Sequence, residues 1–178
     1  MAFTVRVPAP PAGEPTVTVE EDTYEIADLT DDITFAVDYN RGFFGSLKMD
    51  GKDVDGSGYS TTPSGITFRR EYLVSLGAGT YEFTLVTDGG SCTFEITLTR
   101  DKLSFEADGY TAVAAQDLQI PLYGTAGKEL VITLGGAPLA TAAYSVADDK
   151  LTLRAEYLDE LSADIYCVEV TAGQERAK

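Results

Sequence analysis

The feature that most constrains the fold is an internal repeat with a period of 85 residues. Residues 32–85 align with residues 117–170 without a gap, and 13 of these 54 positions are identical, where chance would give about three. Two copies of one module therefore fill most of the 178-residue chain. The identical pairs are Asp32/Asp117, Gly42/Gly127, Gly51/Gly136, Tyr59/Tyr144, Ser60/Ser145, Thr67/Thr152, Arg69/Arg154, Glu71/Glu156, Tyr72/Tyr157, Leu73/Leu158, Leu76/Leu161, Ala78/Ala163 and Tyr81/Tyr166.

Each copy has the pattern of a β-protein. Strand-like segments alternate apolar and polar side chains with a period of two, and short Asn-Arg-Gly and Asp-Gly turn signals separate them. The only helical hints, residues 70–76 and 155–161, are one or two turns long. We therefore predict an all-β protein of two tandem immunoglobulin-like antiparallel β-sandwiches. The strand-like segments are residues 16–21, 33–39, 65–70, 81–87 and 92–99.

The repeat also predicts domain bounds and core residues. Ile66 and Phe68 are expected to face the core, as are their counterparts in the second copy. Tyr81 and Tyr166 each follow a turn of small residues, which is the position of a tyrosine corner. The expected parts are an N-terminal strand and proline-rich linker (1–14), module 1 (15–100), module 2 without its own last strand (101–172) and a tail (173–178).

Composition excludes several classes of function. The net charge of −16 disfavours nucleic acid and anionic membranes as partners, and no segment is apolar enough for membrane insertion. The absence of histidine removes the usual general base and a common metal ligand. Cys92 and Cys167 lie at non-equivalent places in different copies, so we expect free thiols. No catalytic motif or cofactor signature is present, and we expect no enzyme and no cofactor.

The order of the repeated residues resembles the X-two modules. The order is Gly, an apolar residue, Tyr-Ser, Ile-Thr-Phe, Glu-Tyr-Leu and Gly-Thr-Tyr-Glu-Phe-Thr. X-two modules are immunoglobulin-like hydrophilic domains of cellulosomal scaffoldins and bacterial glycoside hydrolases. Where that family has Asp-Tyr, this chain has Gly58-Tyr59 and Ala143-Tyr144. The resemblance implies non-catalytic modules that solubilise, space or weakly bind polysaccharide and cell wall.

The two copies end differently. Copy one continues into the strand that begins at Cys92, and no such strand is recognisable in copy two. An unassigned strand at the other end of the chain carries Phe3, Val5 and Val7 in alternation, as copy one carries Phe94, Ile96 and Leu98. We predict that this assembly strand pairs with copy two, within one chain or from a neighbour. It is alternatively the first strand of copy one, or a tail.

Exposed aromatic residues are the best candidates for a binding surface. Tyr39, Phe43 and Phe44 lie in one loop, and copy two is polar there, with Gly124, Lys128 and Glu129. The difference indicates solvent exposure and a contact role in copy one. Packing between the two copies is the alternative.

The acidic stretch of residues 48–58 suggests a calcium loop at first sight. Asp53 and Asp55 fit the third and fifth positions of an EF-hand loop, but Gly51 and Thr62 then occupy the first and twelfth. Copy two keeps the glycine and lacks the acids. We expect a β-turn and no metal, with Asp53 and Asp55 as weak candidates.

These observations predict a non-catalytic structural or interaction protein. It is expected to be displayed on a particle surface, as a phage decoration or tail-type component, and to dock by strand addition. The alternative is an extracellular scaffoldin-like spacer or a carbohydrate- or cell-wall-binding module. The expected partners are a capsid, tail or scaffold protein, a polysaccharide, or a second copy of the chain. The expected location is the virion surface if Met1 is the natural start, and the cell surface or extracellular space if the chain is a fragment.

Overall fold

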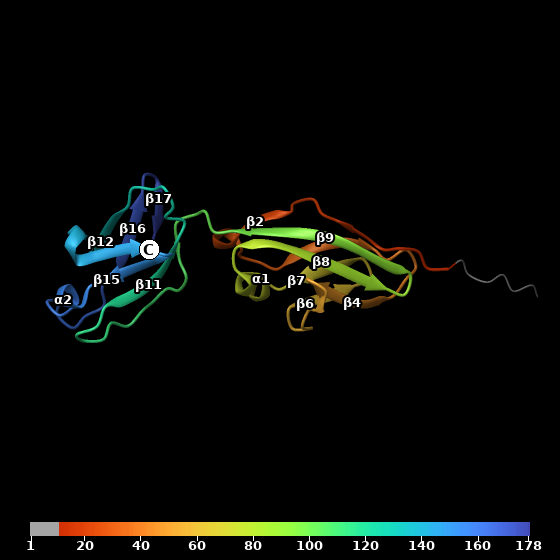
Figure 1. The fold of residues 1–178 in the computed structure, drawn as a ribbon, viewed down its shortest axis with the longest axis horizontal. Coiled ribbons are helices and arrows are strands. Elements are labelled where there is room, and N and C mark those ends of the chain that lie inside the picture. Colours follow the sequence, from red (N-terminus) through yellow and green to blue (C-terminus); the bar gives the residue numbers. More distant parts are fainter. Residues whose placement is uncertain (1–10) are drawn as a thin grey trace, which may run out of the picture. The chain divides into compact units, whose positions relative to one another are not determined.

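The computed structural model describes residues 11–178, which form two compact units. Unit 1 ends at Thr99, and unit 2 comprises Arg100–Lys178 (Figure 1). Each unit consists of two β-sheets, which confirms the predicted all-β fold of two sandwiches. None of the helices within residues 11–178 has the length and apolar character needed to cross a membrane. The predicted assembly strand, with Phe3, Val5 and Val7, lies outside the described residues.

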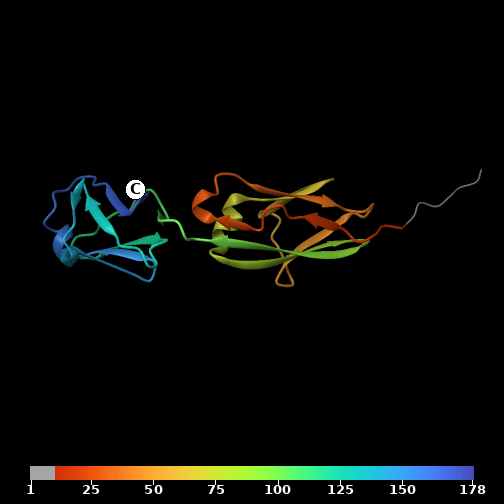
Figure 2. The same ribbon diagram turned by 90° about the horizontal axis from the view of Figure 1, so that it is seen from above.

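Unit 1 is a sandwich of a four-stranded and a five-stranded sheet, seen as two layers in Figure 2. Its strands are β1 (Thr16–Thr18), β2 (Thr23–Glu25), β3 (Ile33–Asp38), β4 (Phe44–Met49), β5 (Lys52–Asp53), β6 (Tyr59–Thr62), β7 (Gly65–Phe68), β8 (Gly79–Thr87) and β9 (Gly90–Thr99). Its helices are η1 (Ile26–Asp28) and α1 (Arg70–Leu76). The strand orders are β1-β3-β7-β6 and β2-β9-β8-β4-β5. Only β2 and β9 pair in parallel among these strands.

Unit 2 repeats this plan, and its counterparts of β4, β8, β9 and α1 are shorter. Its strands are β10 (Ser104–Phe105), β11 (Leu118–Tyr123), β12 (Val131–Leu134), β13 (Ala137–Pro138), β14 (Tyr144–Ala147), β15 (Lys150–Leu153), β16 (Val168–Ala172) and β17 (Glu175–Ala177). Its helices are η2 (Thr141–Ala143) and α2 (Ala155–Leu158). The sheets have the orders β10-β11-β15-β14 and β13-β12-β16-β17. The described residues of unit 2 include no counterpart of β2.

The prediction that module 2 lacks its last strand and ends in a tail is wrong. Residues 175–177 form β17, which pairs with β16, and Ala177 is buried. Val170 of β16 pairs with Ala177 of β17, as Leu85 of β8 pairs with Cys92 of β9, and both positions differ by the repeat shift of 85. Sequence identity between the copies fades here because backbone pairing requires no side-chain identity. The counterpart of β9 is therefore present but has three residues instead of ten.

Several identical residue pairs have the same role in both units. The side chain of Asp32 accepts a hydrogen bond from the backbone N–H of Arg70 at the start of α1 (2.9 Å). Asp117 accepts one from Ala155 at the start of α2 (2.8 Å). Each carboxylate thus satisfies an amide that the helix leaves unpaired. Conservation of this contact explains why an aspartate 38 residues before the helix is kept in both copies.

The predicted tyrosine corner is confirmed in unit 1 and has a looser counterpart in unit 2. The Tyr81 hydroxyl donates to the carbonyl of Leu76 (2.6 Å), at the end of α1, with Gly77 O at 3.2 Å. The Tyr166 hydroxyl contacts Ser162, both at its Oγ (2.9 Å) and at its carbonyl (3.2 Å). Tyr81 is partly buried, whereas the Tyr166 contact is exposed to solvent.

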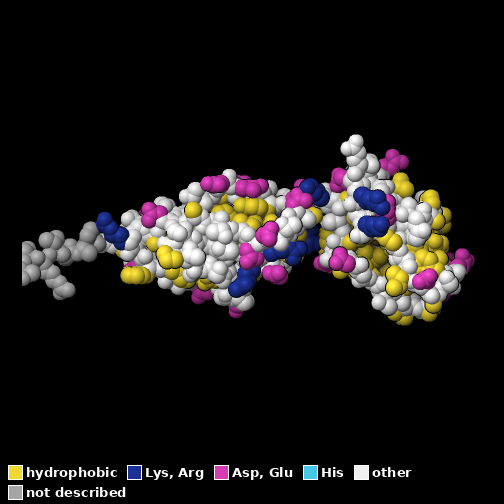
Figure 3. Space-filling model, turned by 180° about the vertical axis from the view of Figure 1, so that it is seen from behind, with side chains coloured by type: hydrophobic (Ala, Val, Ile, Leu, Met, Phe, Trp, Pro, Cys, Tyr) yellow, Lys and Arg dark blue, Asp and Glu magenta, His cyan; other side chains and the backbone are white. Residues whose placement is uncertain are grey.

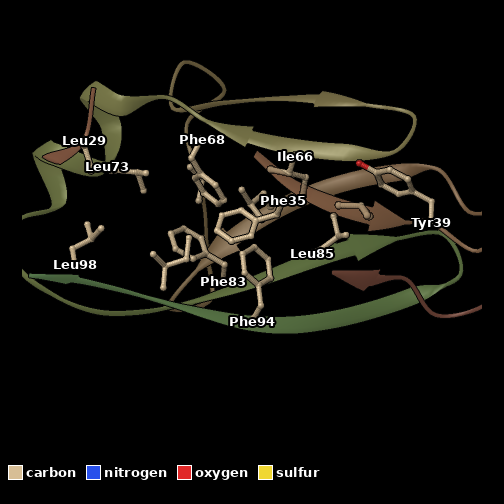
Figure 4. Close-up of a cluster of buried hydrophobic side chains, with 14 residues drawn as sticks. Leu29, Phe35, Tyr39, Ile66, Phe68, Leu73, Phe83, Leu85, Phe94 and Leu98 are labelled. Carbon is tan, nitrogen blue, oxygen red and sulfur yellow. The ribbon is translucent and has the colours of Figure 1, made fainter. Parts of the chain in front are cut away.

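Each unit encloses its own hydrophobic core. In unit 1 the rings of Phe35, Phe68, Phe83 and Phe94 meet between the two sheets (Figure 4). The ring centroids of Phe68 and Phe83 are 4.7 Å apart. Unit 2 has a smaller aliphatic core. The buried apolar residues of unit 2 are Leu103, Ile120, Leu122, Ile132, Leu134, Ala143, Leu151, Leu153, Val170 and Ala177.

Candidate functional site

The three aromatic residues predicted as a binding surface do not share one environment. They line an open depression of about 500 Å³ in unit 1. The Phe43 side chain is 77% exposed, Phe44 is half-buried, and Tyr39 is 9% exposed. Only Phe43 therefore offers an aromatic face to solvent. The other residues around the depression are Asp38, Asn40, Arg41, Gly42, Thr62 and Pro63.

The expected exposure of Tyr39 is wrong. Tyr39 continues the inward phase of Phe35 and Val37 and packs in the core, with its hydroxyl 3.5 Å from the carbonyl of Gly65. This burial raises the pKa of the Tyr39 phenol. Its counterpart Gly124 has a φ of +70°, and a Cβ there would lie 2.3 Å from the backbone of Lys102. The two copies differ at this position because their turns differ, and not because Tyr39 faces solvent.

Phe44 and Phe43 point in different directions from the start of β4. The Phe44 ring packs on Tyr59, with centroids 5.9 Å apart, and joins the core of unit 1. The backbone N–H of Phe43 donates to the carboxylate of Asp88 (2.7 Å). The backbone of Phe43 is thus held in place while its ring stays in solvent.

The acidic loop is a turn, as expected. Asp50 and Gly51 have φ values of +48° and +78° between β4 and β5, and Gly135 and Gly136 repeat the turn with +59° and +84°. Two adjacent residues in the left-handed region are typical of a type I′ hairpin turn.

The carboxylates of this loop are not gathered into a metal site. Asp55 accepts hydrogen bonds from the backbone N–H (2.8 Å) and the hydroxyl (2.6 Å) of Ser57. The hydroxyl bond and then the backbone bond lower the pKa of Asp55. Asp53 lies exposed in β5. Residues 11–178 include no group of three or more His, Cys, Asp or Glu side chains placed to hold a metal ion.

Unit 2 carries a larger feature, which we call the unit 2 groove. It is open to solvent, has a volume of about 730 Å³, and runs between residues 107–114 and residues 158–168. Apolar residues of both sheets reach it, including Ile120, Leu134 and Leu153. Its polar residues include Asp108, Asp159, Asp164 and Lys178. Figure 3 shows one face of unit 2, on which hydrophobic side chains reach the surface in several patches.

The groove lies beside the segment that leads into β16. In unit 1, residues 79–83 of β8 pair with residues 94–98 of β9. Their counterparts in unit 2, residues 164–168, border the groove. Of these, only Val168 belongs to β16, where it pairs with Leu134 of β12. Residues 164–167 lie outside the described strands, and the carbonyl of Cys167 accepts a hydrogen bond from the N–H of Gly135 (2.8 Å). Ile165, in the middle of residues 164–168, is 96% exposed.

Sequence reasoning did not locate this groove. The sequence signal for it is that no full-length last strand is recognisable in copy two, which indicates unpaired backbone and incomplete burial somewhere in that copy. The position of the opening depends on residues 107–114 and 158–168, which are far apart in the chain. Periodicity within either segment does not report on the other.

Both cysteines are free thiols, as predicted. Cys92 packs against the core of unit 1, and burial raises the pKa of its thiol. Cys167 is exposed and lies beside the unit 2 groove, directly before β16.

Comparison with known proteins gives only remote structural similarity. No family model and no curated protein match the sequence. A tri-modular GH5 endo-β-1,4-glucanase from Bacillus licheniformis aligns over 93% of this chain and 38% of its own, with 16% identity and a TM-score of 0.43. The tri-modular endo-β-1,4-glucanase B from Bacillus halodurans aligns over 92% and 34%, with 15% identity and a TM-score of 0.42. The chain thus spans less than two fifths of either enzyme.

A pair of tandem immunoglobulin domains from titin aligns over 93% of this chain and 92% of its own, with 11% identity and a TM-score of 0.43. The fold itself is evident from the strand orders and registers of the two units, which are those of tandem immunoglobulin-like sandwiches.

Proposed function

We propose that this protein is a non-catalytic structural or interaction module that docks by strand addition. In this proposal the two sandwiches are displayed on a particle surface, as a decoration or tail-type component of a phage. The observation that supports it most directly is the apolar groove beside residues 164–168, the segment that leads into β16 and corresponds to the first half of β8. A strand that enters this groove would continue the pairing of β16 with β17, as the second half of β9 continues its pairing with β8.

The rest of the molecule fits a structural role. Each unit has a core of its own, and the pairs of equivalent contacts at Asp32 and Asp117 stabilise one module plan twice. The excess of carboxylates favours solubility at high local concentration. Neither property requires a reaction centre.

The proposal is tested by recovering the chain with its native assembly. Tagged full-length protein is expected to copurify with a capsid or tail protein, and a variant lacking residues 1–8 is expected to lose that protein while melting normally. Copurification that is unchanged by the deletion contradicts docking through the N-terminal strand. A chain that never associates with a particle contradicts the virion location.

A polysaccharide-binding role is the second candidate, and the exposed ring of Phe43 favours it. It agrees with the resemblance to X-two modules and with a spacer or cell-wall-binding role. Pull-down with insoluble polysaccharides is expected to retain the chain and to lose it on Phe43→Ala. Val131→Ala is the matched control, because Val131 is another exposed apolar residue, 52% exposed, in the other unit. Equal retention of both variants contradicts this role.

A further inference from the structure

We infer that the unit 2 groove accepts residues 3–7 from a second copy of this chain, so that copies join head to tail. The inference rests on the proposed function, because it assigns the acceptor and the partner for the same strand addition.

The residues around the groove correspond to the residues that surround the second half of β9 in unit 1. There the buried ring of Phe94 packs on Phe35 (5.6 Å between centroids), Phe68 (6.3 Å) and Phe83 (5.7 Å). With the shift of 85, these three neighbours correspond to Ile120, Leu153 and Val168, and all three line the groove. The groove is thus the equivalent of the space that the second half of β9 fills.

Residues 3–7 supply the side chains that this space requires. Phe3, Val5 and Val7 have the spacing of Phe94, Ile96 and Leu98, which are at most 7% exposed in unit 1. An extended segment would direct these three side chains to one face and Thr4 and Arg6 to the other. Pro8 follows immediately and cannot donate to a sheet, so it marks the end of the pairing.

Charge also favours this segment. Arg6 is the only charged side chain among the first 13 residues, in a chain with a net charge of −16. The groove is lined by three carboxylates, Asp108, Asp159 and Asp164, and by one cation, Lys178. A cationic strand on a predominantly acidic rim is electrostatically complementary.

The equivalence of residues 3–7 with β9 assigns a pairing register between these residues and residues 164–168 of the neighbouring copy. Glu95 pairs with Glu82, whose counterpart is Cys167, so Thr4 comes to lie opposite Cys167. Thr97 pairs with Thr80, whose counterpart is Ile165, so Arg6 comes to lie opposite Ile165. The strand then runs antiparallel to residues 164–168, in the direction of β17.

The reach of the linker favours a second copy over the same chain. Ala12 and Gly13 lie against Gly89, which directly precedes the first residue of β9. The chain leaves unit 1 at Thr99, which is the last residue of β9. Ten residues of β-strand span about 30 Å. The five steps from Val7 to Ala12 span at most about 18 Å. Val7 therefore cannot reach even the point where unit 2 begins, whereas a neighbouring chain has no such restriction.

Disulfide trapping tests both the partner and the register. In a Cys92→Ala background, Thr4→Cys is expected to form disulfides with Cys167 of other copies under mild oxidation. Directly opposed residues on neighbouring strands have the Cβ separation that a disulfide can bridge. The expected result is a ladder of dimers and higher oligomers on a non-reducing gel. Phe3→Cys, one position out of phase, is the matched control and is expected to give little product.

Three results would overturn the inference. They are a disulfide that closes within one chain, no disulfide at all, or a ladder that survives Cys167→Ser. If residues 1–8 still capture a capsid or tail protein while no link to Cys167 forms, this inference fails and the proposed function stands.

Sedimentation velocity of the unmodified chain gives a second, non-covalent test. Val5→Asp would place a charge in the groove and is expected to weaken self-association at least about tenfold. Thr4→Gln, which changes the outward-facing side chain without adding a charge, is the control and is expected to change association little. The melting temperatures of both variants are measured in parallel, so that a loss of folding is distinguished from a loss of association. Equal association of the two variants contradicts docking of residues 3–7 in the groove.

Discussion

Replacement of Tyr81 by phenylalanine tests whether the tyrosine corner stabilises unit 1 more than its counterpart stabilises unit 2. The Tyr81 hydroxyl makes a short bond to Leu76 O (2.6 Å) and lies 3.2 Å from Gly77 O, in a partly buried position. Tyr81→Phe leaves the ring in place and removes the donor from these two carbonyls. We expect a loss of about 1.5 kcal/mol from the free energy of unfolding of unit 1. For a domain of this size that loss corresponds to about 8 °C in melting temperature.

Tyr166→Phe is the matched control. Its hydroxyl bonds only to Ser162, where solvent can replace it, so we expect a loss of about 0.5 kcal/mol or less from unit 2. Hydrogen exchange followed by mass spectrometry reports the two units separately, through the amides of β8 and β16. If Tyr166→Phe speeds exchange in β16 as much as Tyr81→Phe speeds it in β8, the argument from burial is refuted.

Three further predictions concern exposed side chains. Addition of calcium is expected to leave the melting temperature unchanged in the parent chain and in the double variant Asp53→Asn, Asp55→Asn; a calcium-dependent increase lost in that variant would contradict the turn assignment. A thiol reagent is expected to label Cys167 well before Cys92, because burial raises the pKa of the Cys92 thiol; peptide mapping after partial labelling measures the order, and faster labelling of Cys92 would be contrary to it. The hydrogen bond from Lys128, followed by that from the Leu103 amide, lowers the pKa of Glu175. Its contribution to stability is therefore complete above the pKa of the unfolded chain and is lost as the pH falls through the lower folded value. Amide exchange in β17 is expected to accelerate over that range, and an unchanged profile in Glu175→Gln relative to the parent would argue against this role.

Much of the fold could be predicted because the repeat shows the same pattern of apolar and polar residues twice. Ile66 and Phe68 were placed in the core from their period-two phase, and both are fully buried. The helical hint at residues 70–76 coincides with α1. Such features depend on neighbouring residues and on local periodicity, which a sequence displays directly.

The candidate sites were predicted less well because exposure depends on distant segments. Tyr39 follows a strand whose phase predicts burial, but its replacement by Gly124 in copy two was interpreted as a sign of exposure. The backbone of Lys102, which leaves no room for a side chain at Gly124, is the actual reason for that difference. Similarly, the sequence does not predict β17, because its residues form a strand through backbone pairing with β16 and their residue types do not indicate it.

The order of residues alone determines the duplicated module, its strands and its alternating core positions, because these depend on side chains close together in the chain. The location of the unit 2 groove, the exposure of Phe43 and the burial of Tyr39 follow from the fold. They depend on which segments meet across the sandwich, and long-range packing of this kind leaves no periodic trace in the sequence of either segment.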